Sequence, residues 1–284
     1  MKYYTVKFTF SPYSEAARDL LAAECGEHGF ESFDLYDDKL DGFIRVDLFD
    51  EKTLDDIVNH FIMPDVEISY TFEEAEDKNW NEQWEANGFE TINIQGKCCI
   101  YDAKHQAAMS DTDTMVCIGI DARQAFGTGT HDTTQMMVSE LIELDLHQKR
   151  VLDCGCGTGI LSIVAAKFGA SDVVGYDIDE WSVNNSRHNA SINNIENIEI
   201  LEGDVRVLSH VNGLFDVVLA NINRNILIED MFHFKDVMAK DGLLIVSGFY
   251  SEDAHLIVDA AHQLGLHAKG HQERNGWCML KFEL

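Results

Sequence analysis

The first seventy residues alternate between strand-like and helix-like spacing of their apolar positions. Apolar side chains occupy every second position from Tyr4 to Phe10, which predicts a half-buried strand. Residues 17–25 then follow helical spacing as far as two glycines, Gly26 and Gly29, which are expected to end the helix. Three further strands are expected at residues 33–35, 44–48 and 66–70.

Two short segments are expected to organise these elements. Asp41-Gly42 has the composition of a hairpin turn between the second and third strands. The run Thr53-Leu54-Asp55-Asp56 resembles a capping box, which predicts that the second helix begins there. The resulting order, strand–helix–strand–strand–helix–strand, is typical of a small α+β ferredoxin-like domain over residues 1–73.

A polar, acidic linker helix is expected next, over residues 74–94. It carries Trp80 and Trp84 one helical turn apart. Two tryptophans on one face of a linker helix usually pack against a neighbouring domain, and direct contact with a ligand is the alternative. The remaining residues, 95–284, are expected to form one larger domain.

The larger domain contains the most informative stretch of the chain. Residues 151–159 read Val-Leu-Asp-Cys-Gly-Cys-Gly-Thr-Gly, so an apolar strand ends in an acid and turns through three glycines. A helical pattern follows as far as Phe168, and a second apolar strand ends at Asp177. Glycines let the backbone turn tightly and let a bulky ligand approach, while the helix N-terminus favours an anionic group. This layout predicts a nucleotide-cofactor site on a parallel sheet.

The spacing within this loop favours one cofactor over another. A dinucleotide-binding loop normally reads G-x-G-x-x-G, whereas Gly155, Gly157 and Gly159 are evenly spaced. Asp153 is placed to contact an ammonium group, which a nicotinamide dinucleotide lacks. Asp177 is placed to accept hydrogen bonds from a ribose diol. We therefore expect S-adenosylmethionine rather than NAD, although a glycine-rich loop can also mark nothing more than a tight turn.

The remaining apolar runs indicate how the larger domain is built. Strands are expected at residues 151–153, 173–177, 198–201, 215–220 and 243–247, with helical patterns between them. Two final strands flank a turn at Asn275-Gly276. An α/β, Rossmann-like doubly wound sheet with an antiparallel last strand is typical of class I methyltransferases.

Two residues at the ends of later strands are further candidates for the site. Asp204 follows the third core strand, where an acid either reaches the adenine amino group or caps the next turn. Asn221 ends the fourth strand, and its side-chain carbonyl can accept a hydrogen bond from a substrate amine. An asparagine that merely tolerates a turn conformation is the alternative. Asn221 is therefore the candidate catalytic residue.

The net charge and the cysteine content indicate which partners the protein binds and in which cellular compartment it lies. The 284-residue chain has a formal net charge of -29, which argues against sequence-independent binding to nucleic-acid phosphates. The acids concentrate in residues 31–60 and 65–86, which form either a solubilising surface or a docking face for a basic partner. Seven scattered cysteines without metal-ligand spacing, and no membrane-length apolar run, indicate a cytoplasmic protein without a metal site.

A second run of unusual residues gives the chain a family resemblance. Residues 126–134 read Phe-Gly-Thr-Gly-Thr-His-Asp-Thr-Thr. Together with the glycine loop, Gly175–Asp179, Asn221-Ile222 and the tryptophan-containing linker, this run resembles the ribosomal protein methyltransferase A (PrmA) family over nearly the whole chain. The resemblance implies methylation of lysine side chains and of the α-amino terminus of large-subunit ribosomal protein eleven. It also implies that the small N-terminal domain docks this basic protein.

The resemblance assigns cofactor contacts as well. The family's contacts fall on Thr134, Gly155, Asp177 and Asn221. With the residues argued above and the start of the 126–134 run, the expected cofactor-binding set is Phe126, Gly127, Thr134, Asp153, Gly155, Gly157, Asp177, Asp204 and Asn221. Three segments depart from the family's usual sequence: Asp132 stands in place of a proline, Asp121–Gln124 in place of Asp-Pro-Gly, and Asn223-Arg224 in place of small apolar residues.

Other functions remain open on the sequence alone. A nucleic-acid amino methyltransferase would also use an asparagine-led turn after the fourth strand, although the negative charge and the acidic small domain count against it. A non-catalytic S-adenosylmethionine-binding ribosome assembly factor would need the same cofactor loop. An NAD-dependent dehydrogenase is a more distant alternative.

Overall fold

The chain divides into two compact units, Met1–Asn79 and Trp80–Leu284. The computed structural model describes residues 3–36, 39–46, 48–63, 65–74, 88–122 and 127–284. The elements of the small unit are β1 (Tyr3–Ser11), α1 (Glu15–Glu27), β2 (Phe30–Leu35), β3 (Lys39–Arg45), α2 (Glu51–Asn59) and β4 (Glu67–Glu74).

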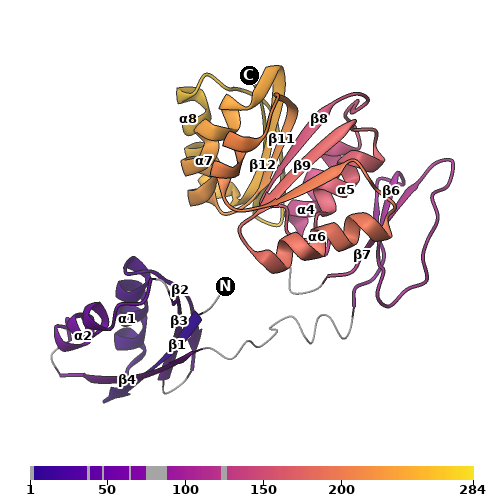
Figure 1. The fold of residues 1–284 in the computed structure, drawn as a ribbon. Coiled ribbons are helices and arrows are strands. Elements are labelled where there is room, and N and C mark those ends of the chain that lie inside the picture. The colour runs from indigo at the N-terminus through magenta and orange to yellow at the C-terminus, as the bar shows by residue number, and fades with distance from the viewer. Residues whose placement is uncertain (1–2, 37–38, 47, 64, 75–87, 123–126) are drawn as a thin grey trace. The chain divides into compact units, whose positions relative to one another are not determined.

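The small unit is an antiparallel sheet with both helices packed against one face. Its strands lie in the order β2-β3-β1-β4, and each neighbouring pair is antiparallel. Alternate strand residues, among them Val6 and Phe8, join Leu21 of α1 and Leu54 of α2 in one buried cluster. Figure 1 shows α1 and α2 side by side on this face. The order of elements and of strands confirms the ferredoxin-like prediction.

The predicted hairpin turn at Asp41-Gly42 is wrong. Both residues lie within β3, where Gly42 pairs with Val6 of β1. A Cβ on Gly42 would lie 2.8 Å from Phe30 Cδ1 and 3.0 Å from Phe33 Cε1. Those two rings stack with centroids 5.8 Å apart. Gly42 therefore makes room for an aromatic pair, and the resemblance to a turn came from composition alone.

The second helix begins earlier than the capping pattern at Thr53 predicted. Asp50 is the N-cap of α2, and its carboxylate accepts hydrogen bonds from the backbone N of Lys52 and of Thr53, each at 3.3 Å. The Thr53 hydroxyl also donates to Asp50 Oδ2 at 2.6 Å. Thr53 thus takes part in the cap from inside the helix, because an ionised carboxylate is a stronger acceptor than a hydroxyl.

The predicted linker helix over residues 74–94 is wrong at both ends. Glu74 is the last residue of β4, and β5 occupies Ile92–Ile94. Trp80 and Trp84, with the rest of residues 75–87, lie outside the described residues.

The large unit is built on a seven-stranded sheet in the order β10-β9-β8-β11-β12-β14-β13. Its strands are β8 (Arg150–Cys154), β9 (Asp172–Asp177), β10 (Ile198–Glu202), β11 (Phe215–Asn221), β12 (Met238–Tyr250), β13 (His267–Arg274) and β14 (Trp277–Glu283). The helices are α4 (Asp132–Leu141), α5 (Ile160–Lys167), α6 (Glu180–Ile192), η1 (Val205–His210), α7 (Arg224–Asp236), η2 (Ser251–Asp253) and α8 (Ala254–Gln263).

The sheet is parallel except at one strand. β14 runs antiparallel to both of its neighbours, β12 and β13, while the other neighbouring strands are parallel. Asn275 and Gly276 form the last turn with φ of 49° and 82°, as predicted. Strand order and direction confirm the doubly wound sheet with an antiparallel last strand.

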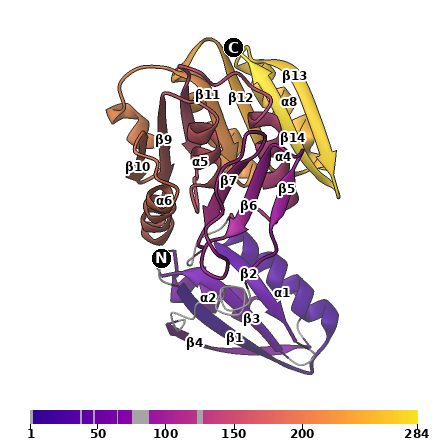
Figure 2. The same cartoon turned by 90° about the vertical axis from the view of Figure 1, so that its right-hand side faces the viewer.

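Two hydrophobic layers enclose this sheet. Alternate strand residues such as Val151 and Val173 pack with α4 and α5 on one face, and Leu152 and Val174 pack with α7 on the other. The separation of helices onto the two faces is visible in Figures 1 and 2. Strands buried on both faces must be apolar throughout, which is why β8 to β12 were visible in the sequence as continuous runs.

A second, three-stranded sheet adjoins the α4–α5 layer. It is formed by β5 (Ile92–Ile94), β6 (Cys98–Asp102) and β7 (Val116–Ile120), with β6 and β7 parallel. Cys98 and Cys99 point to opposite faces of β6, as expected from their adjacency, and belong to different buried clusters. In the described part of the chain, no helix combines the length and apolarity needed to cross a membrane.

The packing role of Gly42 can be tested against a second glycine of the same unit. Gly42→Ala should destabilise the small unit by roughly 1–3 kcal/mol, because the added methyl overpacks the aromatic pair. Gly26→Ala is the control, since a Cβ there would meet nothing within 4 Å and Gly26 lies inside α1. It should stabilise by about 0.5–1 kcal/mol. Hydrogen exchange of β1–β3 peptides in the full-length protein reports both changes, and equal effects would contradict the assignment.

Candidate functional site

The three glycines of the predicted cofactor loop all need a left-handed backbone. Gly155, Gly157 and Gly159 have φ of 68°, 53° and 78°. A Cβ on Gly155 would lie 2.5 Å from Ile222 Cγ2, and one on Gly159 would collide with Ser186. The turn therefore favours glycine at all three positions, and close packing against Ile222 after β11 and Ser186 of α6 also requires it at Gly155 and Gly159.

The backbone of this loop is fastened to the neighbouring strand β9. The N–H groups of Gly155 and Cys156 both donate to the carbonyl of Tyr176, at 2.9 and 3.0 Å. Asp177 Oδ2 accepts from the Gly157 N–H at 2.9 Å, and its Oδ1 accepts from Asp179 N at 3.1 Å. Burial raises the pKa of Asp177 above its usual value. Asp177 thus stabilises the loop as well as ending β9, and its contact with a ribose diol stays a prediction.

Asp153 is buried beneath the same loop. Its Oδ2 accepts hydrogen bonds from the backbone N and the hydroxyl of Ser162, at 3.0 and 2.6 Å. Burial raises the pKa of this carboxyl to about 6, with hydrogen bonds from Ser162 acting in the opposite direction. The carboxyl joins the end of β8 to the first turn of α5. The predicted contact with a cofactor ammonium stays a prediction beside this structural role.

Asn221 and Thr134 meet at the edge of the sheet where β8 and β11 end. The two strands are neighbours, with Ala220 opposite Cys154, so Asn221 follows in register with Gly155. Asn221 Nδ2 donates to Thr134 Oγ1 at 3.4 Å. Its Oδ1 is buried and has no hydrogen-bond partner among the described residues. A buried acceptor without a partner is costly, so this oxygen is a candidate to accept a hydrogen bond from a bound molecule.

Three further residues were predicted to bind the cofactor: Gly127, Asp204 and Phe126. Gly127, with φ of 107°, accepts a 2.6 Å hydrogen bond from Thr158 of the glycine loop, so the 126–134 run does reach this site. Phe126 lies outside the described residues. Asp204 caps η1, and Arg206 Nε lies 2.9 Å from both of its oxygens, which lowers the pKa of Asp204. The capping alternative thus describes Asp204 in the structure.

Two aromatic side chains at this edge, Trp277 and Tyr250, were not singled out from the sequence, and they lie next to His131 of the 126–134 run. His131 is the N-cap of α4, and its ring meets Trp277 edge to face with centroids 4.8 Å apart. Trp277 in turn stacks on Tyr250 at 4.2 Å. His131 thus orders the helix that carries Thr134. The signal was distributed over β12, β14 and the start of α4, so no local motif contained it.

The departures from the family's usual sequence have local partners. Asp132, where the family usually has proline, binds Arg274 at 3.0 Å and Asn275 at 2.8 Å. Its charge also suits the first turn of α4. Asn223 caps α7, and Arg224 binds Asp253 at 2.7 Å. Where the family usually has a proline or small apolar residues, this chain therefore has polar side chains that form ion pairs and hydrogen bonds.

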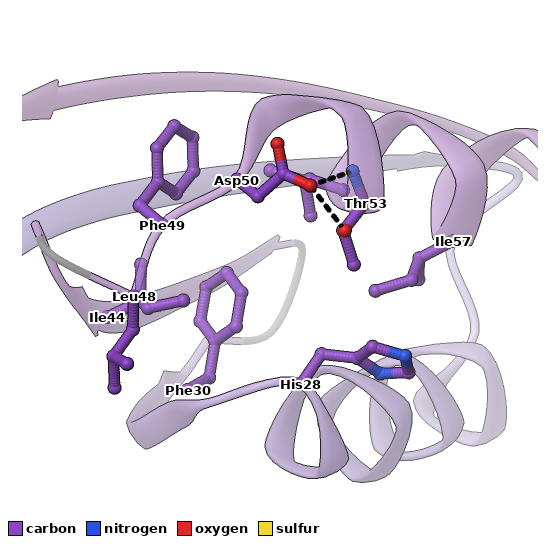
Figure 3. Close-up of a pocket in the computed structure, with 9 residues that line it drawn as sticks. His28, Phe30, Ile44, Leu48, Phe49, Asp50, Thr53 and Ile57 are labelled. Carbon is purple, nitrogen blue, oxygen red and sulfur yellow. Dashed lines mark hydrogen bonds between the residues drawn. The ribbon is translucent and has the colours of Figure 1, made fainter.

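The small unit carries a hollow of its own, which is remote in sequence from the cofactor loop. It has a volume of about 240 Å³ and lies between the end of α1, β2, β3 and the start of α2. Figure 3 shows His28 across from Ile57 and Thr53, with Phe30 and Leu48 on the other side. The lining is mostly apolar and half of Leu48 is exposed. This volume is below the ~300 Å³ typical of small-molecule sites, so the hollow fits a side chain better than a cofactor.

The geometry at the edge of the large sheet fits a nucleotide-like cofactor with a reacting group near Asn221. The glycine backbone gives close approach, Asp177 stands at the end of β9, and Asn221 Oδ1 has no hydrogen-bond partner among the described residues. In an open parallel sheet, ligands bind at the carboxyl ends of strands where the strand order reverses, which here is between β8 and β11.

Comparison with known proteins identifies the family of the chain. A family model described as ribosomal protein L11 methyltransferase (PrmA) matches residues 25–284. A ribosomal protein L11 methyltransferase of Phocaeicola vulgatus is 45% identical over 99% of both chains. One of Porphyromonas gingivalis is 41% identical over 99% of this chain and 98% of its own.

A solved structure has a similar fold over about two thirds of this chain. The crystal structure of a ribosomal protein L11 methylase from Lactobacillus delbrueckii subsp. bulgaricus aligns with a TM-score of 0.62 and 28% identity. The alignment covers 68% of this chain and 98% of that chain. These findings confirm the resemblance drawn from the 126–134 run and the glycine loop.

The two roles of Asp153 can be separated by pH. Because its pKa is raised in the folded protein, its ionisation costs stability, a penalty that is absent below about pH 4 and complete above about pH 6. A cofactor ammonium would favour the ionised form, so affinity should strengthen as pH rises through about 6 and then level off.

Asp153→Asn keeps an oxygen acceptor for Ser162 but cannot ionise. Its dissociation constant for S-adenosylmethionine, measured by calorimetry between about pH 5 and pH 7.5, should lose this pH dependence. The same pH profile in both proteins would show that Asp153 acts on the fold alone.

Proposed function

This chain belongs to the ribosomal protein L11 methyltransferase family, and we propose that it methylates lysine ε-amino groups and the N-terminal α-amino group of ribosomal protein L11. It is a methyltransferase that uses S-adenosylmethionine as methyl donor. All seven cysteines lie in the described part of the chain as buried free thiols, which supports a reducing compartment, the cytoplasm.

The observation that carries the proposal is the unpartnered oxygen of Asn221. It lies at the end of β11, in register with the glycine that follows β8, so an amine bound there would stand beside the cofactor loop. Thr134 binds the amide nitrogen of Asn221 and leaves the oxygen for the substrate. An amine N–H donated to this oxygen would aim the nitrogen lone pair away from Asn221.

The reaction transfers one carbon between two heteroatoms. When bound, the sulfonium of S-adenosylmethionine supplies an electrophilic methyl group. The amine nitrogen forms the new bond to this carbon as the carbon–sulfur bond breaks, and the ammonium product then releases a proton to solvent. The attacking amine must be neutral, although a lysine in water has a pKa near ~10.4. Catalysis by this chain is therefore mostly positioning and desolvation of the amine at Asn221.

Recognition of the substrate protein is assigned to the small unit. Residues 1–73 carry 17 acidic and 6 basic side chains, so a basic protein would be attracted to them. The hollow beside α2 offers an apolar seat next to Asp50, whose carboxylate keeps a lowered pKa through its bond with Thr53. Acidic groups favour the ammonium form of a lysine, so docking and methyl transfer need separate surfaces.

The reaction and the role of Asn221 can be tested in one assay. Labelled S-adenosylmethionine is incubated with purified ribosomal protein L11, with ribosomal RNA, or with neither, and the products are located by mass spectrometry. The unaltered protein should label amino groups of L11. Asn221→Ala should reduce kcat by about 10²-fold while the dissociation constant of the cofactor changes far less, because the lost interaction is with the amine. Label in RNA, or none at all, would overturn the proposal.

Docking at the hollow can be tested with two exposed apolar residues of the same unit. Leu48→Ser should raise KM for L11 by about 5- to 20-fold, because an apolar contact at the seat is lost. Ile62→Ser is the matched control, since Ile62 is 73% exposed and lies outside the hollow. It should leave KM unchanged. Steady-state kinetics at saturating cofactor measures both, and equal KM values for the two variants would contradict docking at this place.

A further inference from the structure

Three buried asparagines lie one helical turn apart on α6 and face the end of β7. Asn185, Asn189 and Asn193 have exposed fractions of 3%, 0% and 6%. Their spacing of four places them on one face of the helix and its C-cap. A buried amide is costly unless its donors and acceptor are all engaged, so the partners of each asparagine indicate its role.

Asn193 braces β7. Its Oδ1 accepts from the Gly119 N–H at 2.9 Å, and its Nδ2 donates to the Gly119 carbonyl at 2.7 Å. The same Nδ2 also donates to the carbonyl of Asn189 at 2.8 Å. The side chain thus pairs with one residue of β7 as a neighbouring strand would, and its three partners all lie on β7 or α6.

Asn189 joins two different segments. Its Oδ1 accepts from the Asp121 N–H at 3.0 Å, directly after β7, while its Nδ2 donates to the carbonyl of Thr158 in the glycine loop at 2.9 Å. A third bond runs from Nδ2 to Asn185 Oδ1 at 3.2 Å. One buried amide therefore spans from the end of β7 to the cofactor loop.

Thr158 extends this connection to the family's characteristic run. It is fully buried, and its hydroxyl donates to the Gly127 carbonyl at 2.6 Å. Asp121, directly after β7, is thus held by Asn189, and Gly127 is held by Thr158. Both ties end on the glycine loop or on the helix packed behind it.

We propose that Asn189 is a positioning residue of the cofactor site, which sets the spacing between the glycine loop and the described run from Gly127 to Thr134 by holding Asp121 directly and Gly127 through Thr158. The inference rests on the proposed function, because it takes the cofactor to bind between these two segments. The role needs two donor hydrogens and an acceptor on one short side chain, which the amide of asparagine supplies. Asn189 acts on the cofactor through Thr158 and Asp121, so its loss should change binding more than its structural cost predicts.

Asn193 provides a matched control. Asn189→Ala and Asn193→Ala each remove three buried hydrogen bonds from the same face of α6, and both should lower the melting temperature to a similar degree. Asn189→Ala should also raise the dissociation constant for S-adenosylmethionine by about tenfold or more, whereas Asn193→Ala should leave it within about twofold. Calorimetry of the full-length protein at a temperature well below both transitions gives the constants.

Thr158→Val keeps the proposal testable if Asn189→Ala does not fold. Valine matches the shape of threonine but cannot donate to Gly127, so it releases the second tie and should also raise the dissociation constant several-fold. Equal constants for Asn189→Ala and Asn193→Ala, or an unchanged constant in Thr158→Val, would overturn the inference. An unaltered protein that does not bind S-adenosylmethionine would instead overturn the proposed function.

Discussion

The rest of the large unit depends on the hydrogen bonds that hold the glycine loop against β9. Three alternate glycines of the loop have a left-handed backbone, and the N–H groups of Gly155, Cys156 and Gly157 donate to Tyr176 and Asp177 of β9. This arrangement requires β8 and β9 to be parallel neighbours with their carboxyl ends level. Once that is met, α5 and α6 pack behind the loop, and β11 is left to present Asn221 at its open side.

The two units differ in the charge of the surfaces to which functions are assigned. The small unit carries an excess of acidic side chains and one mostly apolar hollow, a combination suited to attracting a basic protein. The edge of the large sheet instead offers a neutral amide, a threonine and aromatic rings beside a backbone cradle. Carboxylates stabilise the ammonium form of a lysine, so under the proposed function docking is assigned to the small unit and methyl transfer to Asn221 of the large unit.

Sequence predictions were correct where a feature depends on neighbouring residues, and they were wrong or incomplete where it depends on residues far apart in the chain. Strands buried on both faces and the Asn275-Gly276 turn were recognised because each depends on its own few residues. Gly42 and Thr53 were misread because composition cannot distinguish a turn glycine from one that faces the ring of Phe30, or an N-cap from a residue inside the cap. Asp153 and Asp177 were correctly placed at strand ends, but their bonds to Ser162 and Gly157 were not foreseen.

The sequence by itself determined the fold class, the position of the cofactor loop and the family, since all three depend on short motifs and on the periodicity of apolar residues. Only the tertiary structure decided that Asn221 has an unpartnered oxygen, that Thr134 orients its amide, and that Asn189 ties β7 to the loop. Each of these contacts joins residues more than thirty positions apart. Such pairs are set by how helices and strands pack, and packing leaves no local pattern in the chain.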